Sequence, residues 1–273
     1  MTRQTEPGSP RIRLTAVAWP AAGGLLAGGL LLLILLPVAG LLFSSSPRQI
    51  LRGLSDPLVW PAMRLTVVTS TASLLLVVLT GTPLAWALAR RPRPGRALRL
   101  AETIIGLPVV LPPAVAGVAL LLAFGRRGLL GPALDVVGIG LPFTKVAVVM
   151  AQSFVAAPFY VQAAVAAFRR LDPELVLVAR ALGAGPPRVF FTVGVALSWP
   201  DLAGGAALCW ARALGEFGAT LMFAGNLVGR TQTLPLAIYT ALESDLQTAQ
   251  SLSVVLVAVS VALLFALRGR ARP

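Results

Sequence analysis

The chain has 273 residues, of which 57% are hydrophobic and 12% charged, and its formal net charge is +13. Soluble domains have about a quarter of their residues charged, so this composition indicates an integral membrane protein. The chain has no histidine and one cysteine, Cys209, which excludes Ser-His-Asp catalysis, disulfide frameworks and Cys/His metal sites.

The basic residues alternate with long apolar runs and form no patch with interleaved aromatics. We therefore interpret the charge as membrane topology and expect no nucleic-acid partner. The single lysine, Lys145, follows a threonine, so the glycine-lysine step of an ATP-binding P-loop is missing. The sequence predicts no cofactor in this chain, and Cys209 is expected to be a small packing residue.

A bilayer-spanning helix needs about 20 mostly apolar residues, and six segments meet this requirement. The predicted spans are 16–43, 65–89, 101–124, 146–168, 201–224 and 249–267. The first resembles a secretory leader, but its apolar run is long and lacks a small-residue cleavage site, so we expect a retained span. The predicted fold class is all-α, a polytopic membrane protein with six transmembrane helices in one domain, residues 1–273.

The arginines predict the orientation of these spans. The two termini and the second and fourth connections hold 15 basic residues, whereas the other connections hold six. Basic residues are enriched on the cytoplasmic side of membrane proteins. Both termini and the fourth connection are therefore expected to face the cytoplasm.

The fourth connection, residues 169–200, predicts two short helices joined by a glycine-proline turn. Asp172 is a suitable N-cap before Pro173, and Gly183 and Gly185 end the first helix. One interpretation is a docking surface for another protein. The alternative is an interfacial helix that rests on lipid headgroups.

At this loop the chain resembles the membrane-spanning subunits of bacterial ABC importers, whose cytoplasmic loop has the pattern E-A-A-x-x-x-G and docks on an ATPase subunit. The position of the glutamate is occupied by Leu177, and Glu174 lies one helical turn earlier. The resemblance implies an ATPase-coupling role for Asp172, Glu174, Ala179, Arg180, Leu182, Gly183, Ala184 and Gly185.

Two further stretches, "ARALGEFGATLMFAGN" and "GRTQTLPLAIYTALE", are similar to the permeases of molybdate importers. Sulfate and thiosulfate permeases typically have tyrosine and serine where this chain has Phe217 and Ala219. The resemblance implies the type I permease fold of ABC importers, a permease homodimer, two cytoplasmic ATPase subunits that use ATP, and an extracytoplasmic oxyanion-binding protein. Membrane lipid is the remaining partner.

Arg212 and Glu216 are four residues apart in the predicted fifth span and can pair on one helix face. Ionisable residues inside a membrane are costly and normally face the protein interior or a water-filled cavity. The pair is either a structural contact, helped by close backbone approach at Gly215 and Gly218, or part of a gate beside the translocation path.

Transporters also hold anions at helix breaks. Candidate breaks are Pro108, Pro112 and Pro113 in the third span and residues 225–235 after the fifth, although prolines also produce ordinary kinks. The residues predicted to line the path or gate are Arg212, Glu216, Phe217, Thr220, Pro112 and Pro113.

The sequence thus predicts a non-enzymatic permease subunit that imports molybdate with ATP hydrolysed by its partner. The same machine with sulfate, thiosulfate or tungstate as cargo is an alternative. A gradient-driven secondary anion transporter is another, although such carriers often contain an internal repeat that is absent here. A membrane scaffold that transports nothing is a third, but it leaves the docking loop unexplained.

Overall fold

The structure is a computed structural model that describes residues 15–43, 59–90 and 95–270, together with residues 46, 48, 50, 55 and 57. The predicted topology also relied on arginines outside these residues, among them Arg3, Arg11 and Arg13. Every regular element in the described part is helical. The elements are α1 (Thr15–Phe43), α3 (Val59–Ala89), α4 (Arg96–Val110), α5 (Pro113–Phe124), α6 (Gly131–Val136), α7 (Lys145–Arg170), α8 (Pro173–Ala181), α9 (Pro186–Val189), the π-helix η1 (Phe190–Val195), α10 (Ala196–Leu214), α11 (Gly218–Ala224), α12 (Leu234–Ser244) and α13 (Leu246–Arg270).

The predicted all-α membrane fold is confirmed. The chain divides into a first unit, residues 1–46, which contains α1, and a second unit, residues 47–273, which contains the other helices. Within the part of the chain that the structure describes, four helical stretches are long and apolar enough to cross a membrane: Gly23–Phe43, Val59–Ala89, Lys145–Arg170 and Pro186–Leu214. The bent pair α4–α5 counts as a fifth where its two helices are taken as one span, and α13, whose apolar part is Leu246–Ala262, corresponds to the predicted sixth.

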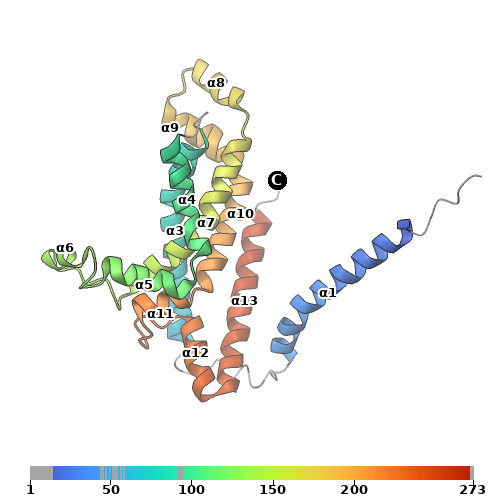
Figure 1. The fold of residues 1–273 in the computed structure, drawn as a ribbon, viewed down its shortest axis with the longest axis vertical. Coiled ribbons are helices and arrows are strands. Elements are labelled where there is room, and N and C mark those ends of the chain that lie inside the picture. Colours follow the sequence, from blue (N-terminus) through green and yellow to red (C-terminus); the bar gives the residue numbers. More distant parts are fainter. Residues whose placement is uncertain are drawn as a thin grey trace, which may run out of the picture. The chain divides into compact units, whose positions relative to one another are not determined.

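The second unit is built around α3, α7 and α10, which lie side by side (Figure 1). Small residues allow this close packing: a Cβ added to Gly81 would lie 3.0 Å from Val161, and one added to Gly205 would lie 2.8 Å from the Cβ of Ala163. Association of membrane helices depends on such contacts because lipid supplies no hydrophobic driving force between helices. Cys209 is fully buried in this core, as its interpretation as a packing residue predicts.

The second unit has two ends. The α8 end consists of α8, α9 and the neighbouring ends of α3, α4 and α7, whereas the α12 end carries α12 and the turn that joins it to α13 (Figure 1). At the α8 end, α8 begins as predicted: Oδ1 of Asp172 accepts a hydrogen bond of 2.9 Å from the backbone N–H of Glu174.

The predicted third span, 101–124, is not one helix. It divides into α4 and α5, whose axes differ in direction by 119°. The break falls at Leu111 and Pro112, because proline lacks the N–H of the helical ladder and disfavours helical backbone in the residue before it. Pro108 lies within α4 and does not end it.

The predicted fifth span, 201–224, is wrong at both ends. Its helix begins earlier, because α9, η1 and α10 run on from Pro186 to Leu214. The second short helix predicted in the 169–200 connection is therefore the first part of this span, and only α8 stands apart. The helix ends after Leu214, residues 215–217 form a break, and α11 follows.

Candidate functional site

The two breaks, residues 111–112 and 215–217, lie beside each other and are called here the paired breaks. A Cβ added to Gly218 would lie 3.0 Å from the Cβ of Pro113 and 3.1 Å from the backbone N of Ala114. One added to Gly117 would lie 2.7 Å from the carbonyl oxygen of Ala219. The two short helices that follow the breaks, α5 and α11, therefore pack backbone to backbone. The close approach predicted at Gly218 occurs, whereas Gly215 meets nothing nearer than 3.8 Å.

Arg212 and Glu216 form an ion pair across the second break. Nη1 of Arg212 lies 2.8 Å from Oε2 of Glu216, and the side chains are 27% and 1% exposed. The other carboxylate oxygen, Oε1, accepts a hydrogen bond of 2.8 Å from the backbone N–H of Ala219. Glu216 therefore joins the last turn of α10 to the first turn of α11.

Helix dipoles explain why this apolar segment contains the pair. The end of α10 leaves carbonyl groups without partners, and a cation such as Arg212 is favourable there. The start of α11 leaves N–H groups without partners, and a carboxylate such as Glu216 is favourable there. The sequence placed both residues on one continuous helix, and in the structure the pair closes a helix break instead.

The remaining residues predicted at the path differ in accessibility. Pro112 and Pro113 are exposed, and the ring of Phe217 packs against Tyr239 of α12 with a centroid distance of 5.3 Å. Thr220 is fully buried, and its hydroxyl has no hydrogen-bond partner among the described residues. The two prolines are thus exposed, whereas Glu216 and Thr220 are buried in the protein interior.

A buried polar seam on α3, which the sequence reasoning missed, connects the helices near this site. It consists of Thr66, Thr69, Ser70 and Ser73, each at most 2% exposed. Nε1 of Trp210 donates to Oγ of Ser70 (3.0 Å), and Oγ of Ser73 donates to Oε1 of Gln152 (3.1 Å). The signal was present, because these hydroxyls recur at helical spacing in an apolar span.

At the α8 end, aromatic rings form a cluster that the sequence reasoning also missed. The aromatic cluster is Trp86, Phe168, Phe190 and Phe191, with Trp86 edge-to-face against Phe168 at 5.2 Å and Phe190 at 5.6 Å. A Cβ added to Gly194 would lie 2.6 Å from Cζ3 of Trp86, so η1 can approach this ring only with a glycine there. Burial and the positive charge of Arg180 lower the pKa of Arg90, whose guanidinium lies 4.5 Å above the Trp86 ring.

The residues predicted for the coupling loop lie on α8 and the turn after it. Gly183 has φ +85°, and the N–H groups of Gly183 and Ala184 donate to the carbonyls of Arg180 and Ala179. This is the Schellman ending, which favours glycine. Large apolar side chains of α8 and its C-cap are exposed, namely Leu175, Leu177, Val178 and Leu182 at 45%, 64%, 56% and 83%.

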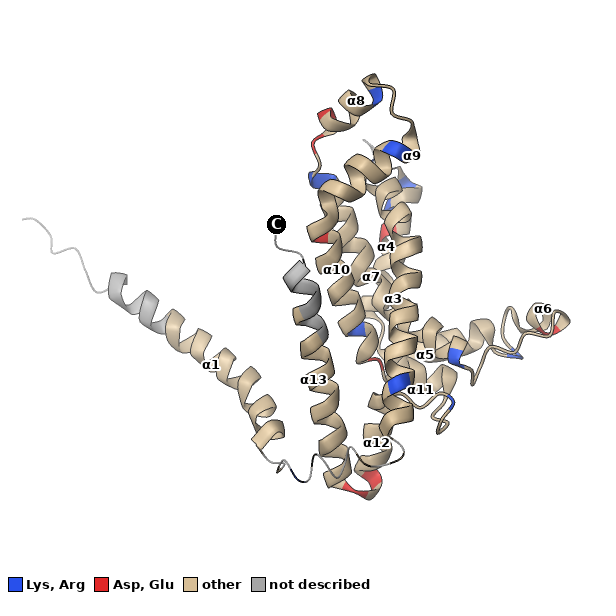
Figure 2. Ribbon diagram, turned by 180° about the vertical axis from the view of Figure 1, so that it is seen from behind, with Lys and Arg blue, Asp and Glu red and all other residues tan. Residues whose placement is uncertain are grey.

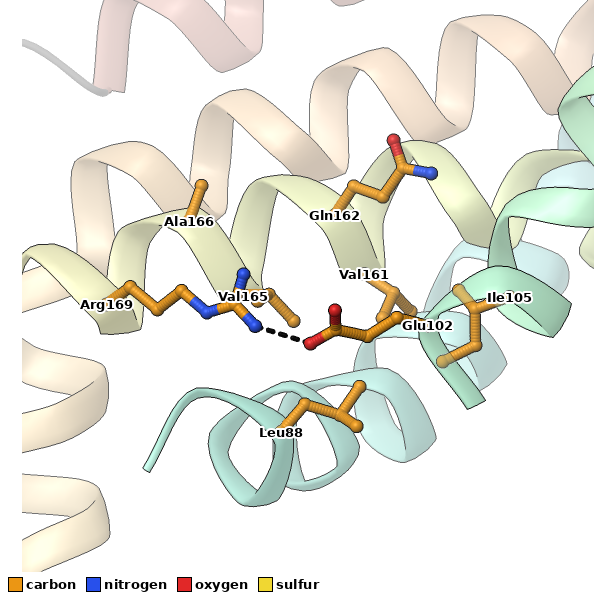
Figure 3. A pocket seen from close by; sticks show the side chains of 8 residues that line it. All are labelled: Leu88, Glu102, Ile105, Val161, Gln162, Val165, Ala166 and Arg169. Atoms are coloured by element: carbon orange, nitrogen blue, oxygen red, sulfur yellow. Dashed lines mark hydrogen bonds and ion pairs between the residues drawn. The ribbon is translucent and has the colours of Figure 1, made fainter. Parts of the chain in front are cut away.

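A pocket of about 340 Å³ lies at the α8 end among α3, α4 and α7 (Figure 3). Its walls are largely apolar, as at Leu88, Ile105 and Val165, and an ion pair between Arg169 and Glu102 crosses it. These two side chains are 49% and 34% exposed, so water screens the pair. The pair connects α4 to α7, but it stabilises the fold less than a buried ion pair would.

Comparison with known proteins gives a consistent result. Residues 81–271 match the family described as "Binding-protein-dependent transport system inner membrane component". A "Molybdenum transport system permease protein" of Mycobacterium tuberculosis is 45% identical over 207 residues, which cover 76% of this chain and 78% of that protein. A "Probable molybdenum ABC transporter permease protein" of Haloferax volcanii is 38% identical over 250 residues, covering 91% and 89%.

Solved structures agree on the fold. A chain from a bacterial ABC transporter involved in the import of alginate has a TM-score of 0.74 at 16% identity, with 93% of this chain and 95% of that chain covered. A chain from the MetNI methionine ABC transporter has a TM-score of 0.63 at 20% identity, covering 80% and 98%. This chain therefore belongs to the family of binding-protein-dependent transport system inner membrane components and has the fold of ABC importer permeases.

Proposed function

We propose that this chain is the permease subunit of an ATP-driven importer that carries molybdate across the bacterial cytoplasmic membrane. The observation that carries the proposal is the 45% identity to a molybdenum transport permease over most of both chains. The chain itself catalyses no chemistry and needs no cofactor, because ATP is used by a partner subunit.

In this proposal the α8 end faces the cytoplasm. Figure 2 locates many of the basic residues at this end. Those in the described residues of this end are Arg90, Arg96, Arg99, Arg169, Arg170, Arg180 and Arg188. Such an excess of arginine at one end is typical of the cytoplasmic side.

An ATPase subunit docks on α8, and its partner docks on α8 of a second, identical permease chain. The exposed apolar side chains of α8 support a protein partner, because they would be covered only in a complex. Leu177 is among them, so the contact at this position is apolar where the family pattern has a glutamate. A binding protein delivers the oxyanion at the α12 end.

The paired breaks lie beside the translocation path between the two permease copies. Glu216 holds Arg212, so the guanidinium does not trap the passing oxyanion. Conduction requires that a site bind its ion weakly enough to release it. ATP binding closes the ATPases, α8 transmits the motion to the spans, and the path opens toward the binding protein.

Uptake of labelled molybdate at nanomolar concentration tests the cargo, in cells with and without this chain. We expect uptake to disappear on deletion and to resist excess unlabelled sulfate. Loss of molybdate uptake under excess sulfate would identify sulfate as the cargo. Competition by unlabelled tungstate measures how well the importer distinguishes molybdate from tungstate.

The energy source is tested in the same assay. ATP-dependent uptake that vanadate inhibits is expected of the importer. Uptake that only an uncoupler abolishes would instead support a gradient-driven carrier, which is the second candidate function.

Docking is tested at Gly183. Valine is strained at its φ of +85°, so Gly183→Val should unwind the end of α8 and lower co-purification of the ATPase by roughly tenfold, since such backbone costs about 1–2 kcal/mol. Gly95→Val is the matched control at the same end, because Gly95 has φ −61° and no atom within 4 Å of an added Cβ. Undiminished co-purification of the Gly183→Val protein would refute docking through α8.

A further inference from the structure

A second pocket, of about 550 Å³, lies where α3 and α7 begin, among residues that include Trp60, Arg64, Lys145 and Gly229. Arg64 and Lys145 come from different helices and both side chains are exposed. Neither is paired with a carboxylate among the described residues. The pocket therefore presents two cations to whatever enters it.

The face of α3 that continues from this pocket is apolar and exposed. Trp60, Val68, Leu75 and Leu79 are 61%, 56%, 55% and 72% exposed. At 3.6 residues per turn they and Arg64 lie within about 100° of one another around the helix. The order along this face is an indole, a guanidinium and then exposed aliphatic side chains, with the half-buried Thr71 among them.

With α3 centred in the bilayer and parallel to its normal, the length of the helix gives the depth of this arrangement. Its 31 residues span about 46 Å, which exceeds the hydrocarbon thickness of about 30 Å by about 8 Å at each end. Eight ångströms correspond to about five residues, which places Arg64 at the boundary between hydrocarbon and headgroups. Trp60 then lies at the level where tryptophan is enriched in membrane proteins.

We propose that Arg64 and Lys145 bind the phosphate of an anionic phospholipid in the leaflet at the α12 end, with its acyl chains along the exposed face of α3. Two cations complement a phosphodiester carrying one negative charge together with the polar end of its headgroup. The aliphatic face from Val68 to Leu79 is about 16 Å long, close to the depth of one leaflet. A free oxyanion would also bind the two cations, but it has no apolar part that would contact this face of α3.

The test uses the full chain in nanodiscs and measures the enrichment of phosphatidylglycerol over phosphatidylcholine in the lipid retained after transfer to detergent. Replacing both cations in R64Q/K145Q should reduce that enrichment by about fivefold for each cation. Added salt should reduce it in the unaltered protein as well.

The matched control is R126Q/R127Q, which removes the same charge from two exposed arginines between α5 and α6 that do not line the pocket. It should keep the enrichment. Equal loss in both double variants would show a diffuse charge effect and overturn the site, as would unchanged enrichment in R64Q/K145Q.

Two further outcomes assign the pocket to another occupant. If R64Q/K145Q abolishes binding of labelled molybdate in pure phosphatidylcholine nanodiscs, the cations serve a free oxyanion and the lipid proposal fails. If the variant instead dissociates permease dimers whatever the lipid, a second copy covers this face and the proposal fails in that case too.

Discussion

The paired breaks and the α8 end hold their helices together with different chemistry. At the paired breaks a buried carboxylate, 1% exposed, binds a guanidinium and a backbone N–H. At the α8 end the contacts among α3, α7 and η1 are made by aromatic rings packed edge to face. The first arrangement depends on charge and the second on shape.

The difference follows from what each region must satisfy. A helix that stops inside a membrane leaves backbone groups without partners, and no water is available to bind them. Glu216 accepts one of the free N–H groups, that of Ala219, and Arg212 places its positive charge near the free carbonyl groups at the end of α10. In the aromatic cluster, α3, α7 and the run from α9 through η1 to α10 are not broken, so no buried ion pair is required there, and the packing depends instead on the fit of Trp86 against the backbone of Gly194.

The largest expected effect is that of Glu216→Gln, which removes the charge and keeps an oxygen for the N–H of Ala219. Arg212 then lacks its anion, and an unpaired ionised residue in a membrane costs about 3 kcal/mol. We expect molybdate uptake to fall by roughly tenfold or more, and by more than the amount of inserted protein. Asp201→Asn on α10 is the control, because Asp201 and its partner Arg170 are 50% and 70% exposed.

A double variant, R212Q/E216Q, separates the two interpretations of the pair. If the pair is structural only, two neutral side chains should restore inserted protein and uptake together. If the pair is part of the gate, protein amount should recover while uptake stays low. Normal uptake in Glu216→Gln itself would rule out a gating role.

The next largest effect is that of Gly194→Ala. The added Cβ would lie 2.6 Å from Cζ3 of Trp86, so the ring must move out of the aromatic cluster, and overpacking of this kind costs about 1–3 kcal/mol. The measurement is thermal unfolding in detergent. Gly204→Ala on α10 is the control, since an added Cβ there meets nothing within 4 Å.

Relief of the clash by a smaller ring tests the cause. W86F/G194A should be more stable than Gly194→Ala alone, because phenylalanine lacks the outer ring edge that holds Cζ3. Equal destabilisation in both proteins would mean that the glycine matters for the π-helix backbone and not for the contact with Trp86.

Composition and the length of apolar runs predicted the presence of the spans, because hydrophobic thickness sets helix length, but they gave the fifth span the wrong bounds. They did not locate the breaks. In the third span the prolines 112 and 113 indicated one correctly, since proline acts on its own backbone. In the fifth span the break at residues 215–217 has no proline, and the close packing of Pro113 against Gly218 beside it comes from another helix, which no local pattern reveals.

The Arg212–Glu216 contact illustrates the same limit. Spacing predicted the pair, and the structure contains it, but spacing could not supply the N–H of Ala219 that makes Glu216 a link between two helices. Trp86, Phe168 and Phe190 come from three separate helical segments. No local pattern connects them, so the aromatic cluster could be found only in the fold.

A smaller effect is expected from Trp210→Phe. The indole N–H donates to Oγ of Ser70 at 3.0 Å, and loss of one such bond costs about 1 kcal/mol. Thermal unfolding in detergent is again the measurement. Trp199→Phe is the control on the same helix, because Trp199 is 55% exposed. An equally large shift of the unfolding temperature in that variant would mean that the loss of any indole, and not of this hydrogen bond, causes the effect.

The smallest effect is that of Glu102→Gln at the pocket of the α8 end. It breaks an ion pair as Glu216→Gln does, but Glu102 and Arg169 are 34% and 49% exposed, and exposed pairs contribute about 0–1 kcal/mol. Unfolding should shift little, and the shift should shrink further in high salt. Molybdate uptake in Glu102→Gln should stay near normal, and a fall as large as in Glu216→Gln would mean that the pair controls the position of α4 during transport even though it is exposed.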